Sequence, residues 1–189
     1  MKIVKAEDET LLEDIYRLRY RVLCEEIETL DRSDYPEGLE KDRYDEYADQ
    51  YAILGEGGAL IGCFRVIYGC PLGFPTLNVM EMNDLLERID AERICEISRI
   101  TIDKRYRGLG TVMKIFKLIM IYGCPFMKRE GMDHVLCAVE ENLYRLLRMA
   151  DVPFMKIGEA KEYLERYRYP TLLSMDELAQ KHPEFCRFR

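Results

Sequence analysis

The sequence predicts one α/β domain, residues 1–189, in which helices flank both faces of a central mixed β-sheet. The length of 189 residues corresponds to about one domain. Hydrophobic residues make up 48% of the chain and charged residues 33%, a balance typical of a globular protein. Two hairpin strands come early, and strands alternate with helices after them, an order that favours a mixed sheet covered on both sides.

The first part of the chain predicts a strand, a helix and a hairpin. Lys2–Ala6 reads as a short strand, and apolar side chains recur at helical spacing along Asp8–Glu26. Thr29–Asp49 is acidic and predicts a long loop with a helical turn, a feature that is often functional. Gln50–Leu54 and Ala59–Tyr68 predict a hairpin around a glycine-rich turn.

Strands and helices alternate in the rest of the chain. Prolines and a glycine at 71–75 interrupt it, and Asn83–Asp90 predicts a short helix that begins at an asparagine cap. Arg93–Asp103 alternates its side chains between two faces and predicts a strand, whereas Glu159–Tyr169 is ambiguous. The other expected elements are a turn at Arg105–Gly110, helices at about Thr111–Glu130, Glu140–Met149 and Met175–Lys181, and strands at Asp133–Val139, Pro153–Ile157 and Tyr169–Leu173.

The cysteines and histidines favour neither a disulfide framework nor a metal site. The chain has 7 cysteines, an odd number, with no C-x-x-C pair and only 2 histidines. Cys63, Cys95 and Cys137 lie in apolar runs, so we expect them to be small buried hydrophobic residues.

Targeting signals are not evident in the sequence. The longest apolar run, Leu118–Tyr122, is far shorter than the roughly 20 residues of a membrane helix. The N-terminal segment turns acidic at once and has no apolar core of a signal peptide. We therefore expect a cytoplasmic protein without a membrane span.

The charge of the chain is negative overall but unevenly spread. The net charge of -7 argues against general nucleic-acid binding. Between Lys104 and Arg129, however, there is no Asp or Glu. We call the basic side chains of this stretch the basic segment: Lys104, Arg105, Arg107, Lys114, Lys117, Lys128 and Arg129. The basic segment is either a solvated helix face or a landing site for an anionic partner.

The turn Arg105–Gly110 has the properties of an anion site. It follows one predicted strand directly and precedes one predicted helix, so free backbone N–H groups at the helix start point towards a ligand. Gly108 and Gly110 allow the backbone to come close to that ligand. A phosphate or pyrophosphate is the natural guest, and the alternative is an ordinary glycine turn.

This R-x-x-G-x-G pattern resembles the pyrophosphate loop of the GNAT superfamily of N-acyltransferases. The resemblance implies a GNAT-like fold that binds acyl-CoA, or the phosphopantetheine of an acyl carrier protein, where strands four and five splay apart. It implies a thioester co-substrate and no tightly bound cofactor. The implied donor-binding residues are Ile100, Ile102, Arg105, Arg107, Gly108, Leu109, Gly110 and Thr111. The family often has an asparagine on the following helix, which Asn142 matches. Many members also have a tyrosine that protonates the leaving thiolate, but Met149 stands at that position here, and Tyr144 is the nearest tyrosine that could replace it.

A second set of residues is similar to the acyl-homoserine-lactone synthases and their relatives, the long-chain N-acyl amino acid synthases and the exosortase-associated acyltransferases. The resemblance covers about residues 10–173. It implies that Arg19, Asp42, Asp45 and Arg65 bind the acceptor, and that Glu96, Ser98 and Arg99 of a Glu-x-Ser-Arg motif are catalytic. The synthases of lactones usually carry aromatic residues at the positions of Leu23 and Thr29, and this chain has no Trp. Both differences, together with the glycine-rich turn, favour the N-acyl amino acid branch.

The same charged residues can be interpreted from physical chemistry. Charges on predicted strands in apolar surroundings are costly unless they are paired, so three arginines and three carboxylates (Asp42, Asp45 and Glu96) should form a partly buried network. The network is either purely structural or an acceptor site. In the second case Arg65 or Arg99 would hold a carboxylate, and Glu96 would take a proton from the acceptor's ammonium.

The predicted function is transfer of a fatty acyl group from an acyl-carrier-protein or acyl-CoA thioester to the amine of an amino-acid-like acceptor. The basic segment would steer the acidic carrier protein or the anionic CoA. One alternative is an acyl-homoserine-lactone synthase that uses S-adenosylmethionine, and another is a regulator that binds an acyl ligand without catalysis. Apolar side chains that line an acyl tunnel, or simply form the core, are Phe64, Phe74, Leu77, Met80, Met82, Phe116, Met120, Phe126 and Met127.

Overall fold

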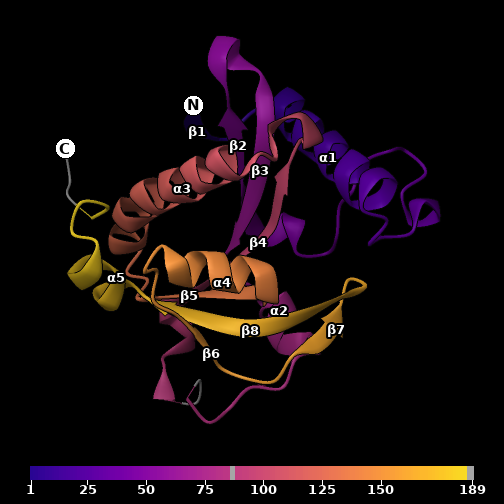
Figure 1. The fold of residues 1–189 in the computed structure, drawn as a ribbon. Helices are drawn as coiled ribbons and strands as arrows, with labels where there is room; N and C mark the ends of the chain where they lie inside the picture. The colour runs from indigo at the N-terminus through magenta and orange to yellow at the C-terminus, as the bar shows by residue number, and fades with distance from the viewer. Residues whose placement is uncertain (86–87, 187–189) are drawn as a thin grey trace. The chain divides into compact units, whose positions relative to one another are not determined.

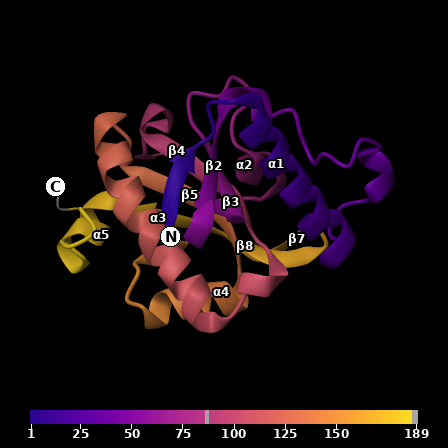
Figure 2. The same ribbon diagram turned by 90° about the horizontal axis from the view of Figure 1, so that it is seen from above.

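The computed structural model describes residues 1–85 and 88–186 (Figures 1 and 2). The chain divides into two compact units. Unit 1 is Met1–Ile67 with Ser98–Ile119, and unit 2 is Tyr68–Ile97 with Met120–Arg189. The expected single domain stays a prediction, and the two units are described in turn.

Unit 1 contains an antiparallel sheet with one helix packed on it. Its strands are β1 (Lys2–Lys5), β2 (Ala48–Leu54), β3 (Leu60–Ile67) and the second half of β4 (Ile94–Ile102). β1 pairs with β2, and β2 with β3, in antiparallel register. The helix α1 (Glu9–Tyr20) begins at Asp8, whose Oδ1 accepts the N–H of Leu11 at 2.8 Å, and it continues into a π-helical turn over Arg21–Glu26.

The apolar face of α1 forms the core of unit 1. Ile15, Leu18 and Val22 pack in one cluster with Ala52 of β2 and Cys63 of β3. The helical spacing seen in the sequence therefore marks the buried face, as expected. The chain then leads from the helix to β2 through the segment predicted as a loop at Thr29–Asp49, which we call the acidic loop. It contains two short 3-10 turns, at Arg32–Asp34 and Asp45–Tyr47.

Unit 2 contains a mixed sheet with helices on both faces. Its strands are the first half of β4, β5 (His134–Glu140), β6 (Phe154–Lys156), β7 (Lys161–Tyr163) and β8 (Arg166–Ser174). Its helices are α2 (Pro75–Val79), α4 (Glu141–Met149) and α5 (Met175–Lys181). β4 runs parallel to β5, which pairs with β8 in antiparallel register, and β8 also pairs with β6 and β7. Figures 1 and 2 show α4 and α2 on opposite faces of the β5–β8 pair.

The mixed α/β fold class is confirmed. The parallel pairing that makes the sheet mixed is short, because it joins Ile94–Glu96 to His134–Leu136 only. Beyond Ile97, β4 belongs to unit 1. The splay expected between the fourth and fifth strands stays a prediction.

Three segments differ from the expectations or complete them. Pro75 begins α2 where a simple break was expected, because its fixed φ suits the first turn of a helix. The ambiguous segment forms the β7–β8 hairpin, whose turn residues Leu164 and Glu165 have φ of 51° and 53°. Neither is a residue typical of such a turn, so no hairpin could be predicted at this point of the chain. The helix expected at Asn83–Asp90 includes residues 86–87, outside the described residues, although Asn83 does accept the N–H of Leu85 at 3.2 Å.

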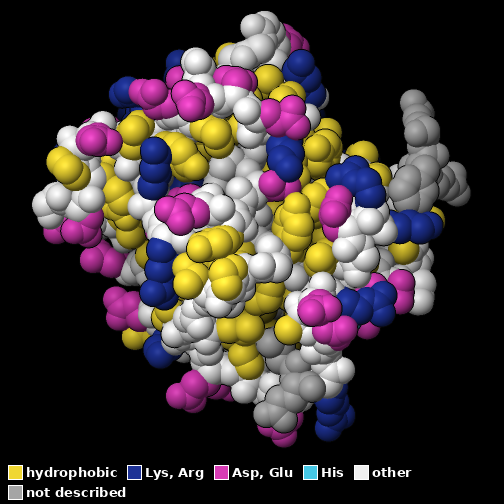
Figure 3. All heavy atoms as spheres, turned by 180° about the vertical axis from the view of Figure 1, so that it is seen from behind, with side chains coloured by type: hydrophobic (Ala, Val, Ile, Leu, Met, Phe, Trp, Pro, Cys, Tyr) yellow, Lys and Arg dark blue, Asp and Glu magenta, His cyan; other side chains and the backbone are white. Residues whose placement is uncertain are grey.

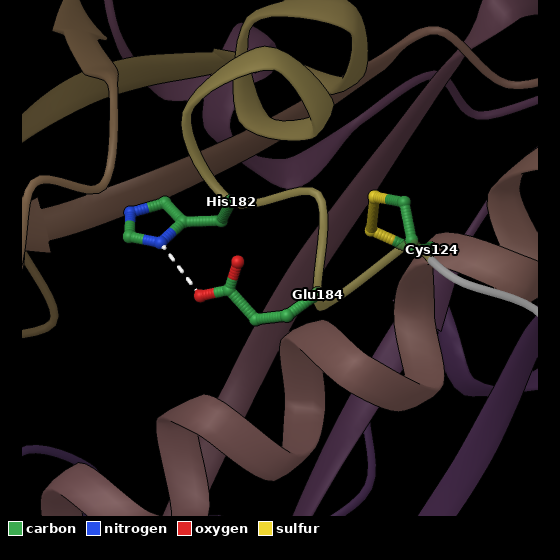
Figure 4. The surroundings of a disulfide bond; sticks show 4 residues. Cys124, His182 and Glu184 are labelled. Carbon is green, nitrogen blue, oxygen red and sulfur yellow. Dashed lines mark hydrogen bonds and ion pairs between the residues drawn. A yellow bond between two sulfur atoms is a disulfide. The ribbon is translucent and has the colours of Figure 1, made fainter.

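The cysteines follow the expectation with one correction. Cys63, Cys95 and Cys137 are buried and free, and burial raises the thiol pKa of Cys63 and of Cys95 to about 12. Cys124 and Cys186, in contrast, form a disulfide across a Cα–Cα distance of 5.1 Å, which lies in the normal range for such bonds. Figure 4 shows this bond beside the hydrogen-bonded pair His182 and Glu184. The cysteine count alone could not reveal a single bridge between residues 62 positions apart.

The helix α3 (Leu109–Arg129) is long and strongly apolar. It has the length and composition of a membrane span, with a mean hydropathy of 1.4 over 18 residues, of which 28% are buried. Core helices of other folds have the same properties, so the expected absence of a membrane span stays a prediction. Figure 3 shows that exposed hydrophobic side chains lie among acidic and basic ones on the face of the protein seen there.

Candidate functional site

A buried cluster of ionised side chains connects four segments of unit 1. α1 provides Arg19, β3 provides Arg65 and β4 provides Arg99, and the acidic loop surrounds them with Glu40, Asp42 and Asp45. We call these six residues the ion cluster. It forms because each of the three elements provides one arginine that pairs with carboxylates of the acidic loop.

Arg19 lies at the centre of the ion cluster with a fully buried side chain. Its Nη1 and Nη2 donate to the two carboxylate oxygens of Asp45 at 2.8 and 3.0 Å, and its Nε donates to Glu40. Burial disfavours the charged form of Arg19, but Glu40 and Asp45 raise its pKa above the usual value. Burial likewise opposes ionisation of Asp45, yet Arg19 and Arg65 hold the pKa of that carboxyl well below its usual range.

Arg65 uses only part of its hydrogen-bonding capacity. Its Nη1 donates to Asp42 at 2.5 Å and to Asp45 at 2.9 Å, and its Nε donates to the hydroxyl of Ser98 at 3.1 Å. Its Nη2 is buried and has no hydrogen-bond partner among the described residues. A buried guanidinium N–H group without an acceptor is unusual and costly, so this atom is a place for an anionic group that the protein does not supply.

Arg99 combines an unusual backbone with a side chain that is bound to two carboxylates. Its φ of 52° lies in the left-handed region, which non-glycine residues rarely adopt within a strand. Its Nε donates to Glu40 at 3.1 Å and its Nη2 to Asp42 at 2.9 Å. Burial lowers the pKa of Arg99, but the charges of Glu40 and Asp42 and the hydrogen bond to Glu40 together raise it above the usual value. Both Arg65 and Arg99 are bound by carboxylates, but of the two only Arg65 has a buried N–H group without a partner among the described residues, so Arg65 is the better candidate for binding a ligand's carboxylate.

The third carboxylate of the ion cluster is Glu40, which the network expected from the sequence did not include. The membership of Glu96 in that network stays a prediction. Glu40 is fully buried and bridges Arg19 and Arg99. In the sequence it is one of many acidic residues in a loop, and only the adjacent Leu39 hints at burial. Because loop residues have no periodic pattern, the buried carboxylate cannot be told from its exposed neighbours.

Glu96 lies in unit 2 and is equally buried, with 1% of its surface exposed. It sits on β4 opposite Leu136 of the parallel strand β5. Its Oε2 accepts the backbone N–H of Thr76, the second residue of α2, at 3.0 Å. The helix that the sequence did not predict thus supplies a partner for the proposed catalytic carboxylate.

The low pKa of Asp45 makes the stability of the protein depend on pH. A carboxyl whose pKa is lower in the folded than in the unfolded protein stabilises the fold above its unfolded pKa of about 3.9, and this contribution is lost as the pH falls. Asp45→Asn should therefore reduce the free energy of unfolding at pH 7 by on the order of 2 kcal/mol. The fall of this free energy between about pH 5 and pH 2 should also be less steep than in the unchanged protein. Urea unfolding at several pH values tests this. Asp14→Asn, which changes an exposed carboxylate of α1, is the matched control and should keep the slope of the unchanged protein. Equal slopes for Asp45→Asn and the unchanged protein would contradict the assignment.

The predicted turn Arg105–Gly110 follows β4, and its last two residues, Leu109 and Gly110, already belong to α3. Its arginines, however, are not free charges. Arg105 donates twice to Asp103, at 3.0 and 2.8 Å, and Arg107 donates to the carbonyl oxygen of Ile102 at 2.7 Å and to Glu26. These bonds shape the turn but leave less positive charge for an anion than the sequence suggested. An added Cβ at Gly108 or Gly110 would meet open space, so a ligand can approach the backbone at the start of α3.

The other predicted site residues fall into two groups. On the donor side, Ile100 and Ile102 are half-buried on β4, Thr111 is half-buried on α3, and Leu109 is exposed. On α4 in unit 2, Asn142 is exposed and Tyr144 is half-buried under the Nζ of Lys156. Met149 is 85% exposed and has no acidic group that could protonate a leaving thiolate.

The candidate tunnel residues that are buried, and so are part of the core, are Phe64, Phe74, Met80, Phe116, Phe126 and Met127. In the described part of the chain, no group of three or more His, Cys, Asp and Glu side chains is placed to hold a metal ion.

Comparison with known proteins identifies one matching family and several similar structures. The family model described as N-acyl amino acid synthase FeeM matches residues 14–176. No curated protein sequence matches the chain.

The similar structures agree in fold over nearly the whole chain. The structure of TofI in a ternary complex with an inhibitor and MTA has a TM-score of 0.74 at 16% identity and covers 98% of this chain and 100% of TofI. BjaI, a CoA-dependent acyl-homoserine lactone synthase solved with SAM and isopentyl-CoA, has a TM-score of 0.69 at 22% identity, covering 97% of this chain and 88% of BjaI. FeeM, an N-acyl amino acid synthase from uncultured soil microbes, has a TM-score of 0.69 at 16% identity, with 95% of each chain covered. At such identities the likeness shows the fold.

Proposed function

Since the chain belongs to the N-acyl amino acid synthase FeeM family, we propose that it transfers a fatty acyl group from a thioester to the amine of an amino-acid-like acceptor. The chain is an acyltransferase of this family. The proposal concerns the acceptor, the donor and the residues that act on each.

The unpartnered Nη2 of Arg65 is the observation that carries the proposal. An α-amino acid has a carboxylate beside its amine, and a carboxylate is the ligand that a guanidinium N–H binds most strongly. Asp42, Asp45 and Ser98 fix the position of the Arg65 guanidinium, so the guanidinium is already oriented for a carboxylate. In this role the ion cluster is the frame of the acceptor site, and Arg19 and Glu40 fix that frame.

The acceptor amine must lose a proton before it can attack, because an ammonium group has no lone pair. The proposal assigns this proton to Glu96, directly or through a water molecule. The amine then attacks the thioester carbonyl, the C–N bond forms, the C–S bond breaks, and the thiolate leaves. Ser98 and Arg99 follow Glu96 on β4, and the left-handed backbone at Arg99 breaks the regular strand geometry where a backbone N–H would face the carbonyl oxygen.

The donor is an acyl-CoA or an acyl carrier protein, both of which carry phosphopantetheine and are anionic. The turn Arg105–Gly110 would bind the phosphates, with Ile100 and Ile102 beside the pantetheine arm. Lys104, Lys114 and Lys117 are exposed around this turn in unit 1 and would attract either donor. The donor is consumed in the reaction, so the proposal needs no tightly bound cofactor. Location in the cytoplasm stays a prediction.

The test compares acceptors with and without a carboxylate. Purified protein is incubated with medium- and long-chain acyl-CoA or acyl carrier protein, and with either the common L-amino acids or their decarboxylated amines. Mass spectrometry then quantifies the N-acyl products. We expect amino acids to react about 100-fold faster or more, because the decarboxylated amines leave Arg65 unpaired. Arg65→Lys should erase most of this preference, whereas Arg93→Lys, at an exposed arginine, should not.

Other products would point to the alternatives. An acyl-homoserine lactone formed from S-adenosylmethionine would replace the amino-acid acceptor. Binding of acyl-CoA without any acylated product would favour a regulator. Equal rates for amino acids and their decarboxylated amines would refute the role of Arg65.

A further inference from the structure

Thr76 and Glu96 form a fixed pair in unit 2. The backbone N–H of Thr76 donates to Glu96 Oε2 at 3.0 Å, and both side chains are buried, with exposed fractions of 0% and 1%. Pro75, immediately before Thr76, begins α2 and restricts the backbone there. The carboxylate and the threonine therefore lie next to each other in a rigid arrangement.

The hydroxyl of Thr76 is not used by the protein. Thr76 Oγ1 is buried and has no hydrogen-bond partner among the described residues. Thr171, equally buried in the same unit, shows the usual behaviour, because its Oγ1 donates to the carbonyl oxygen of Cys137 at 2.9 Å. An unpaired buried hydroxyl costs stability, and valine would fill the same volume without that cost. Thr76 thus carries a polar group that the fold does not need.

We infer that the hydroxyl of Thr76 binds the acceptor's amine and orients it at Glu96. The inference rests on the proposed function. A hydroxyl oxygen can accept a hydrogen bond from an ammonium group without adding charge to the site. An amine that comes close enough to give its proton to Glu96 also reaches Thr76, because the backbone of Thr76 is bonded to the same carboxylate.

The chemical step balances with these two groups. The ammonium donates one N–H to Thr76 Oγ1 and gives one proton to Glu96, which leaves a neutral amine with its lone pair directed at the thioester. The C–N bond forms and the C–S bond breaks. A second proton from the nitrogen ends on the departing thiolate, so the products are an amide, a thiol and a protonated Glu96 that returns its proton to solvent. Thr76 is neither oxidised nor acylated and serves to hold the amine in position.

Three variants test the inference by steady-state kinetics and thermal unfolding. With the acceptor found in the product assay, Thr76→Val should lower kcat/KM for the acceptor about ten- to a hundredfold. Its KM for the thioester should not change, and its Tm without substrate should stay the same or rise. Thr76→Ser keeps the hydroxyl and should restore most of the activity. Thr171→Val, the matched control, should show the opposite pattern, with a lower Tm and unchanged acceptor kinetics, because it removes a hydrogen bond that the fold uses.

The outcomes separate this inference from the proposed function. If the unchanged protein acylates amino acids and Thr76→Val does so equally well, the inference is wrong and the proposed function stands. If Thr76→Val loses activity only in proportion to a lower Tm, its role is structural and the inference is also wrong. If the unchanged protein acylates no amine with any donor, the proposed function fails and the inference fails with it.

Discussion

Replacing Arg19 with methionine is expected to lower the free energy of unfolding by about 3–5 kcal/mol. Arg19 is fully buried and is shared between Glu40 and Asp45, which are themselves almost completely buried. Methionine fills a similar volume but supplies no charge. Glu40 and Asp45 would keep only Arg99 and Arg65 as cationic partners, so the three carboxylates of the ion cluster would share two arginines and one negative charge would be uncompensated. The cost reflects this uncompensated charge and is not a measure of the net value of the ion pairs, since burial of the charges already opposes their attraction.

Chemical denaturation at pH 7 measures this effect. The matched control is Arg17→Met on the same helix, because Arg17 is exposed and pairs with Glu13 one turn earlier. Surface pairs of this kind contribute little, so the control should stay within about 0.5 kcal/mol of the unchanged protein. If both variants lose the same stability, the ion cluster is not buried in solution as it is in this structure.

Replacing Glu96 with glutamine is expected to reduce kcat by a factor of about 10² to 10⁴. Glutamine has the same shape, and its amide oxygen can still accept the N–H of Thr76. The fold and the donor site should therefore survive while the proton acceptor is lost. Product formation, measured by mass spectrometry with saturating thioester, gives the rate, and calorimetry with acyl-CoA gives the binding.

Glu92→Gln is the control for this prediction, because Glu92 is exposed just before the same strand. It should retain full activity and full binding. A Glu96→Gln protein that still acylates its acceptor at the unchanged rate would remove Glu96 from the mechanism. Unchanged thioester binding with no turnover in either protein would favour the regulator instead.

Sequence patterns predicted the elements with a strong period. The alternation of Arg93–Asp103 corresponds to β4 at Ile94–Ile102, and the closing helix at Met175–Lys181 has the expected bounds. In these elements, buried positions recur at a fixed spacing along the sequence, so the local pattern shows which side chains the fold buries. The helix α2 was missed because proline was interpreted only as a chain breaker, although it also suits the first turn of a helix.

The candidate site was predictable in residue type but not in contacts. The three arginines and the two aspartates do meet in unit 1, as the expected network required. Glu40 could not be singled out, because ion pairs across distant segments leave no mark in local spacing, and the membership of Glu96 in the network stays a prediction. The orphaned groups, Arg65 Nη2 and Thr76 Oγ1, could not be predicted at all, because the lack of a partner is a property of the folded protein.

The ion cluster also has a consequence for the order in which the protein folds. Its ion pairs join residues that are 20 to 59 positions apart in the sequence, such as Arg65 with Asp45 and Arg99 with Glu40. Each contact closes a long stretch of chain, and the loop-closure entropy must be overcome before the charges can attract one another. The cluster is therefore assembled only after α1, β3 and β4 have come together. A partly folded chain therefore has its helix and strands but no ordered ion cluster, and we expect activity to return during refolding only with the last step in the folding of unit 1.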